Sequence, residues 1–174
     1  ISNIVLGKQD KAGLITFSDK PETMIKANRS KTQLKKILES LYKEREGVVE
    51  ANYESLYMGV RNLVSSRSLL FLYTNFESTY ALHRVLPQLR KLNKQHLLVV
   101  VFFENTEITT QPSAEVENLE DIYTQITAEH YALTKIQIAQ LLKQFGIFTM
   151  LTRPETLTVS TINKYLELKS RGMI

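Results

Sequence analysis

The chain has 174 residues, a hydrophobic content of 43% and a formal net charge of +4. A chain of this length and composition forms a domain with a sizeable core, which excludes disordered and collagen-like classes. It has no cysteine, which excludes disulfides, thiol catalysis and Cys-ligated metal sites. The longest apolar runs, at 69–73 and 97–103, are shorter than the roughly 18 residues that a membrane-spanning helix needs.

The first elements alternate between strand and helix patterns. Residues 1–6 have the pattern of a helix end, and because Ile1 opens the chain we expect a fragment of a longer protein. Residues 12–17 predict a buried strand, which forms a hairpin with an edge strand at 23–27. Ser30 and Gln33 predict a capping box for a helix. The apolar face of that helix comprises Leu34, Ile37, Leu38, Leu41 and Tyr42.

The middle of the chain continues this alternation. Asn52 predicts the cap of a helix over 53–64, and the apolar run 68–74 predicts a central strand covered on both faces. A helical pattern over 81–92 contains Pro87, which predicts a kink or a second helix start. Residues 96–103 predict another buried strand.

The last part predicts a loop at 108–116 and a long helix over 119–145. Gly146 is expected to cap this helix before a strand at 147–151. Pro154 then starts a final helix, which ends before Gly172.

Buried strands joined by helices predict an α/β fold of the doubly wound type, with a mostly parallel sheet and helices on both faces, in a single domain over 1–174. Ligands of such sheets bind beyond the carboxyl ends of the strands. The candidate residues at that edge are Ser18, Asp19, Thr74, Asn75, Glu104 and Asn105.

Signals for catalysis are weak. The six glycines are scattered and form no dinucleotide-binding or phosphate-binding loop. His83, His96 and His130 lack metal-ligand spacing, and we interpret His96 as a partly exposed structural residue. Ser18 has no flanking glycine, which argues against a hydrolase nucleophile. We therefore predict no enzyme, no bound metal and no cofactor.

Charged side chains form three clusters. The first is a candidate nucleic-acid surface of basic residues: Lys26, Arg29, Lys31, Lys35 and Lys36. The second comprises Arg84, Arg90, Lys91 and Lys94, and an acidic stretch over 104–129 is the third. Each cluster fits either a charged partner or a solvated face, and the solvated face is favoured.

Three segments together resemble the von Willebrand factor A-like domains of the bacterial domain-of-unknown-function family fifty-eight. Residues 10–18 resemble the second strand of that family, and residues 67–75 resemble its fourth. Residues 163–172 look like its closing helix. The resemblance spans nearly the whole chain.

The resemblance implies a metal-ion-dependent adhesion site that holds Mg²⁺ in intact family members. By this resemblance, we expect the first-strand motif to lie upstream of Ile1, and Asn75 stands where the family has a later Asp. Asn52-Tyr53 stands near the place of the loop Thr. A neutral amide holds a hard dication less well than a carboxylate does, so we expect a degenerate site without metal.

The family order also implies that a central strand is missing between strands 12–17 and 68–74. We predict that these two strands pair directly, with pairing between two copies of the chain, a homodimer, as the second alternative.

The function implied by the resemblance is a protein-interaction domain. Its partner would be a MoxR-type AAA+ ATPase or the substrate of that ATPase. The implied location is the cytoplasmic part of a bacterial protein whose membrane anchor lies in the full-length chain only. The alternative, from the residues, is a nucleic-acid-binding domain that uses the basic helix region 26–36.

Overall fold

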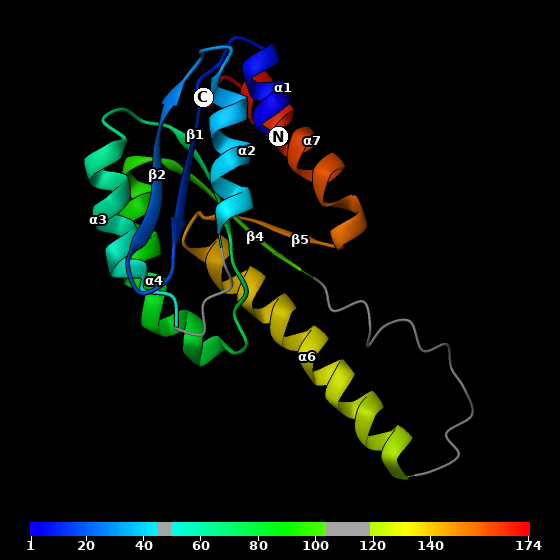
Figure 1. The fold of residues 1–174 in the computed structure, drawn as a ribbon. Coiled ribbons are helices and arrows are strands. Elements are labelled where there is room, and N and C mark those ends of the chain that lie inside the picture. The colour runs from blue at the N-terminus through cyan, green and yellow to red at the C-terminus, as the bar shows by residue number, and fades with distance from the viewer. Residues whose placement is uncertain (45–49, 104–118) are drawn as a thin grey trace.

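The computed structural model describes residues 1–44, 50–103 and 119–174, without the side chains of 119–125 and 128. The described strands form two sheets (Figure 1). An antiparallel hairpin pairs β1 (Ala12–Phe17) with β2 (Pro21–Asn28). A parallel sheet has the order β3-β4-β5, made of β3 (Leu69–Tyr73), β4 (Leu97–Phe103) and β5 (Phe148–Thr152).

Helices connect and cover these strands. They are α1 (Ser2–Gly7), α2 (Gln33–Lys43), α3 (Tyr53–Leu63), α4 (Thr79–Gln95), α6 (Leu119–Gln144) and α7 (Leu157–Ser170), the last preceded by a 3₁₀ turn at Pro154–Thr156. In the part of the chain that the structure describes, no helix combines the length and hydropathy needed to cross a membrane.

The parallel sheet has one core on each face. Alternate side chains of β4, such as Leu98 and Val100, pack with buried residues of α3, α4 and α6. The intervening residues Val99 and Val101 pack on the other face with Leu168 of α7. Residues 97–102 of β4 are almost fully buried, as expected for a central strand with helices on both sides. The predicted α/β architecture is therefore confirmed at this level.

The hairpin is a separate sheet, so the predicted direct pairing of strands 12–17 and 68–74 is wrong. Side chains join the two sheets instead. The ring centroid of Tyr53 lies 5.5 Å from that of Phe17, the last residue of β1, and 5.9 Å from that of Phe76 beyond β3. Ile15 packs against the same core. Only three of the five described strands are parallel, and pairing between two copies of the chain stays a prediction.

Gly13 fits the hairpin because β2 passes very close to it. A Cβ atom at Gly13 would lie 2.7 Å from the carbonyl oxygen of Ile25 and 2.9 Å from the amide nitrogen of Ala27. The pairing register shifts between Ala12 and Leu14. A glycine in a strand commonly marks such a close approach.

The start of α2 differs from the prediction. Thr32 occupies the cap position and makes no side-chain capping bond, so the capping box is wrong. The buried Gln33 amide instead donates to the carbonyl oxygens of Ala12, at 2.7 Å, and Lys26, at 2.9 Å. Gln33 thereby fastens α2 to the hairpin.

The predicted apolar face of α2 is mostly uncovered. Ile37 is buried, but Leu38, Leu41 and Tyr42 are 57%, 46% and 92% exposed. The helical period is confirmed, but the expected burial of the whole apolar face is wrong, since the buried residues of α2 are Gln33 and Ile37.

Other predicted helix signals are found at their expected places. Asn52 caps α3 by accepting from the amides of Glu54 and Ser55. Gly146, with φ of 70°, follows α6. Helix α4 continues through Pro87, so no second helix starts there. The predicted loop at 108–116 lies outside the described residues.

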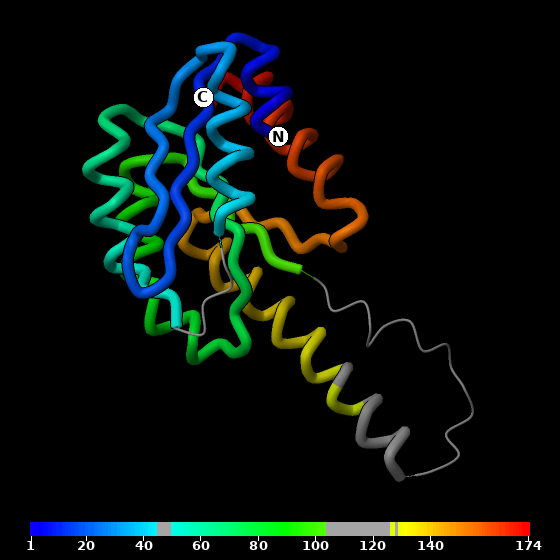
Figure 2. Tube along the Cα trace, in the orientation of Figure 1, coloured from blue at the N-terminus to red at the C-terminus, as the bar shows by residue number. Residues whose placement is uncertain are grey.

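Hydrogen bonds join the N-terminal part of the chain to its last helix. Figure 2 shows α1 and α7 at the same end of the fold, and Figure 1 shows α6 extending away from it. Tyr165 and Lys169 of α7 both donate to the carboxylate of Asp10, which precedes β1. These bonds tie the C-terminal helix to the beginning of the hairpin.

Candidate functional site

The candidate edge residues lie where the strands end. Ser18 and Asp19 follow β1, and Thr74 and Asn75 follow β3. Glu104 and Asn105, predicted to follow β4 at the same edge, lie outside the described residues. The structure therefore places two parts of the candidate site, one on each sheet.

Helix α3 begins between these two parts. The backbone amide of Asn52 donates to the carbonyl oxygen of Ser18 at 2.6 Å. The adjacent Tyr53 hydroxyl forms a hydrogen bond with the Thr74 hydroxyl. Burial raises the pKa of Tyr53, although its hydrogen bond to Thr74 acts in the opposite direction. Tyr53 is therefore a neutral phenol that links the two sheets.

The side chains of Ser18 and Asp19 contact other residues of the hairpin turn. The Ser18 hydroxyl lies 3.0 Å from a carboxylate oxygen of Asp19 and 2.5 Å from one of Glu22. All three bonding groups are exposed at the hairpin turn. Among the described residues, no side-chain hydrogen bond joins this group to Thr74 or Asn75, so the predicted four-residue site is divided.

Asn75 is held by a lysine that sequence reasoning missed. Lys135 of α6 donates to the side-chain oxygen of Asn75 and, at 2.7 Å, to the carbonyl oxygen of Phe76. Its ammonium nitrogen lies 4.7 Å from the centroid of the Tyr131 ring and 6.0 Å from that of Phe102. Lys135 is only 2% exposed. The helical pattern of 119–145 gave no sign of a buried cation at this position.

Tyr131 completes this cluster. Burial favours the neutral phenol, but hydrogen bonds with Asn75 and Lys135, together with the positive charge of Lys135, lower the pKa of Tyr131 below its ordinary value. The negative charge of Glu77 opposes this effect. Asn75, Lys135 and Tyr131 therefore form one polar network at the carboxyl end of β3.

These residues do not fit a Mg²⁺ site. Mg²⁺ prefers carboxylate and water oxygens in an octahedral shell. Here the Asn75 oxygen faces an ammonium group, and the Thr74 hydroxyl is bonded to Tyr53. In the described ranges, no group of three or more His, Asp or Glu side chains is placed to hold a metal ion.

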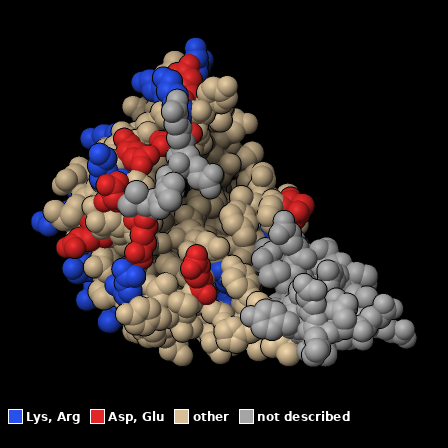
Figure 3. Space-filling view, turned by 60° about the horizontal axis from the view of Figure 1, so that its bottom comes forward, with Lys and Arg blue, Asp and Glu red and all other residues tan. Residues whose placement is uncertain are grey.

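The predicted basic surface is exposed and spread over several elements. Lys26 lies on β2, Arg29 and Lys31 lie between β2 and α2, and Lys35 and Lys36 lie on α2. Lys35 pairs with Glu39 at 3.7 Å. On the face seen in Figure 3, basic and acidic side chains alternate along the left side of the molecule.

His96 differs from its interpretation as a partly exposed residue. It is 5% exposed, and its Nδ1 atom has no hydrogen-bond partner among the described residues. Burial lowers its pKa, whereas a bond with the backbone of Ser66 acts in the opposite direction. His96 lies between the end of α4 and the start of β4, where it packs as a neutral ring.

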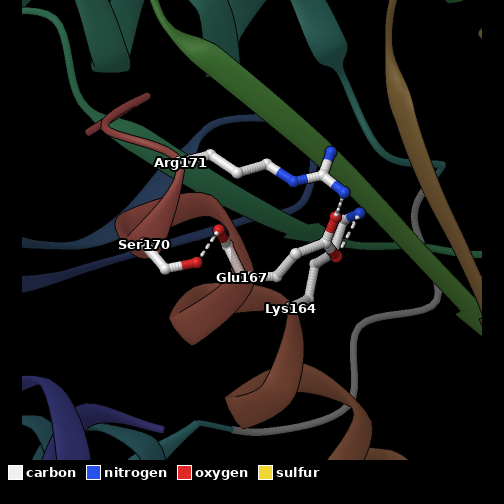
Figure 4. Close-up of polar contacts among 4 residues, drawn as sticks. All are labelled: Lys164, Glu167, Ser170 and Arg171. Carbon is white, nitrogen blue, oxygen red and sulfur yellow. Dashed lines mark hydrogen bonds and ion pairs between the residues drawn. The ribbon is translucent and has the colours of Figure 1, made fainter.

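The closing helix carries its own ion-pair cluster, drawn in Figure 4. The carboxylate of Glu167 lies 3.0 Å from the Lys164 ammonium and 2.9 Å from the Arg171 guanidinium, while the Ser170 hydroxyl donates to the Glu167 carbonyl oxygen. The hydrogen bond with Lys164 is the main reason that the pKa of Glu167 is lowered. Pairs three and four residues apart stabilise a helix, so this cluster needs no ligand to explain it.

The chain was compared with protein-family models, with curated proteins and with solved structures. None of the three comparisons finds a match. The resemblance to the von Willebrand factor A-like family therefore stays a prediction based on the three quoted segments.

Proposed function

We propose that this chain is a non-enzymatic protein-interaction domain, with α2 as its contact surface. The observation that carries the proposal is the uncovered apolar side of α2, where Leu38, Leu41 and Tyr42 are exposed at helical spacing. Contiguous exposed apolar residues on a soluble domain commonly mark a protein-binding site. The candidate edge supports a non-catalytic role, since Thr74 and Asn75 are engaged by Tyr53 and Lys135.

The partner that we propose is a MoxR-type AAA+ ATPase or its substrate, in a membrane-anchored bacterial protein. This part rests on the family resemblance alone. The exposed apolar side of α2 indicates where the contact would occur, because an amphipathic helix can place such residues in a hydrophobic groove of the partner.

The test is binding of a purified MoxR-type ATPase to the chain, measured by calorimetry. A variant with Leu38→Ser, Leu41→Ser and Tyr42→Ser should bind at least about tenfold more weakly. A control with Val159→Ser and Leu166→Ser removes exposed apolar residues from α7 and should bind normally. Equal binding by all three proteins would refute α2 as the contact surface.

The alternative function is nucleic-acid binding through Lys26, Arg29, Lys31, Lys35 and Lys36. The exposure of these side chains favours nucleic-acid binding, and the ion pair of Lys35 with Glu39 weakens it. Binding of random duplex DNA that falls steeply with salt would support this alternative. Absence of binding at low salt would remove it.

A further inference from the structure

The second basic cluster surrounds a small hollow on α4. The hollow has a volume of about 240 Å³ and is lined by Pro87, Arg90, Lys91 and Lys94. These four residues are spaced so that they share one face of the helix, and all are exposed. Helix α4 contains no Asp or Glu, so the helix itself supplies no neutralising charge.

Two of the cations are oriented by aromatic rings of neighbouring elements. The guanidinium carbon of Arg90 lies 4.7 Å from the ring centroid of Phe145, which follows α6. The ammonium of Lys91 lies 5.6 Å from the centroid of Tyr57 on α3. A ring face attracts a cation and leaves its net charge in place, whereas a carboxylate would cancel it.

The carboxylates of the described residues do not neutralise these three cations. Within 1–44, 50–103 and 119–174, Arg90, Lys91 and Lys94 form no ion pair, and the ion pair of α4 is that between Arg84 and Glu50 at 3.0 Å. A cation in the last helical turn also complements the helix dipole. That effect accounts for Lys94 but not for the ring contacts of Arg90 and Lys91.

We propose that this hollow binds a compact phosphate anion with two adjacent phosphoryl groups, of the pyrophosphate class. Arginine presents paired N–H donors that match phosphate oxygens, and lysines add positive charge beside it. The volume lies below the range of about 300–1,000 Å³ typical of drug-sized ligand pockets, which favours a small anion. This site is distinct from the α2 surface and does not depend on the proposed function.

The experiment is calorimetric titration of the chain with inorganic pyrophosphate at low salt. A triple variant with Arg90→Gln, Lys91→Gln and Lys94→Gln should lose affinity by at least about tenfold. A matched variant with Lys26→Gln, Lys35→Gln and Lys36→Gln removes the same charge from the hairpin and α2, and it should bind as the unaltered chain does. Because all six positions are exposed, thermal unfolding should show that both variants fold.

Two further ligands, a nucleoside diphosphate and duplex DNA, test which chemical group the hollow binds. A nucleoside diphosphate that binds as pyrophosphate does, with the same dependence on the α4 cations, would support recognition of the phosphoryl groups. Absence of pyrophosphate binding would overturn the proposal, as would equal losses in both triple variants. Binding confined to duplex DNA would overturn it too, because the hollow would then be part of a wider basic surface.

Discussion

The ammonium group of Lys135 donates a hydrogen bond to the side-chain oxygen of Asn75, sixty positions earlier in the chain. The same ammonium bonds the Phe76 carbonyl oxygen at 2.7 Å. The carboxyl end of β3 thus already holds a positive charge that the chain itself supplies. This relationship changes what substitutions at Asn75 should do.

We predict that Asn75→Asp stabilises the fold without creating a Mg²⁺ site. The new carboxylate would pair with the buried Lys135 ammonium, which should raise the free energy of unfolding by about 1 kcal/mol after desolvation is subtracted. Thermal unfolding with and without Mg²⁺ measures both effects. A midpoint that rises with Mg²⁺ in the single variant would contradict the prediction. The double variant with Lys135→Met is the control that frees the carboxylate.

Replacing Lys135 with Met should destabilise the fold and change the titration of Tyr131. The oxygens of Asn75 and Phe76 lose their donor, and a buried acceptor without a partner costs about 1–3 kcal/mol. The pKa of Tyr131 should rise, because Lys135 holds it low through a hydrogen bond and its charge. Difference titration of tyrosine absorbance against a Tyr131→Phe protein isolates this residue. An unchanged Tyr131 titration would show that Lys135 does not control it.

Asp10 should make the fold sensitive to strong acid. Its pKa is lowered mainly by hydrogen bonds from Lys169 and Tyr165. A carboxyl with a lowered folded pKa contributes stability above its unfolded pKa of about 3.9, and this contribution is lost as pH falls through the folded value. Since the pair is substantially exposed, Asp10→Asn should cost at most about 1 kcal/mol near neutrality. Urea unfolding should show the difference disappearing in acid, and Asp19→Asn serves as the exposed control.

His96 should produce a second pH dependence in a milder range. Because burial lowers its folded pKa, the unfolded chain binds a proton first as pH falls below about 6.5. Stability should therefore decline from that pH downward until the folded ring also titrates. His96→Gln should flatten this decline, whereas the exposed His83→Gln should leave it unchanged. Parallel pH profiles for all three proteins would refute a role for His96.

The secondary structure was largely predictable because local signals and burial agreed. The apolar run of β4, the Asn52 cap and the Gly146 turn each depend on nearby residues alone. Gln33 shows where this reasoning fails. Its expected capping role was local, but its amide bonds two strands that the sequence pattern does not connect to it.

The candidate site was predictable only in part. The rule that strands end at one edge correctly identified Thr74 and Asn75 as edge residues of the parallel sheet. It could not reveal that the hairpin forms a separate sheet, which divides Ser18 from them. Nor could it place Lys135 beside Asn75, since that contact depends on how α6 packs on the sheet. Long-range packing, more than residue type, decided the chemistry of this edge.

The division into two sheets also bears on how the molecule opens. Among the described strands, no backbone ladder connects the hairpin to the parallel sheet. The hairpin is attached by side chains such as Phe17, by the Gln33 and Asp10 bonds, and by the single backbone bond between Asn52 and Ser18. Amide hydrogens of β1 and β2 should exchange with solvent through a local opening that leaves β4 protected. The hairpin would then be the part of this fold that can detach and rejoin while the rest remains intact.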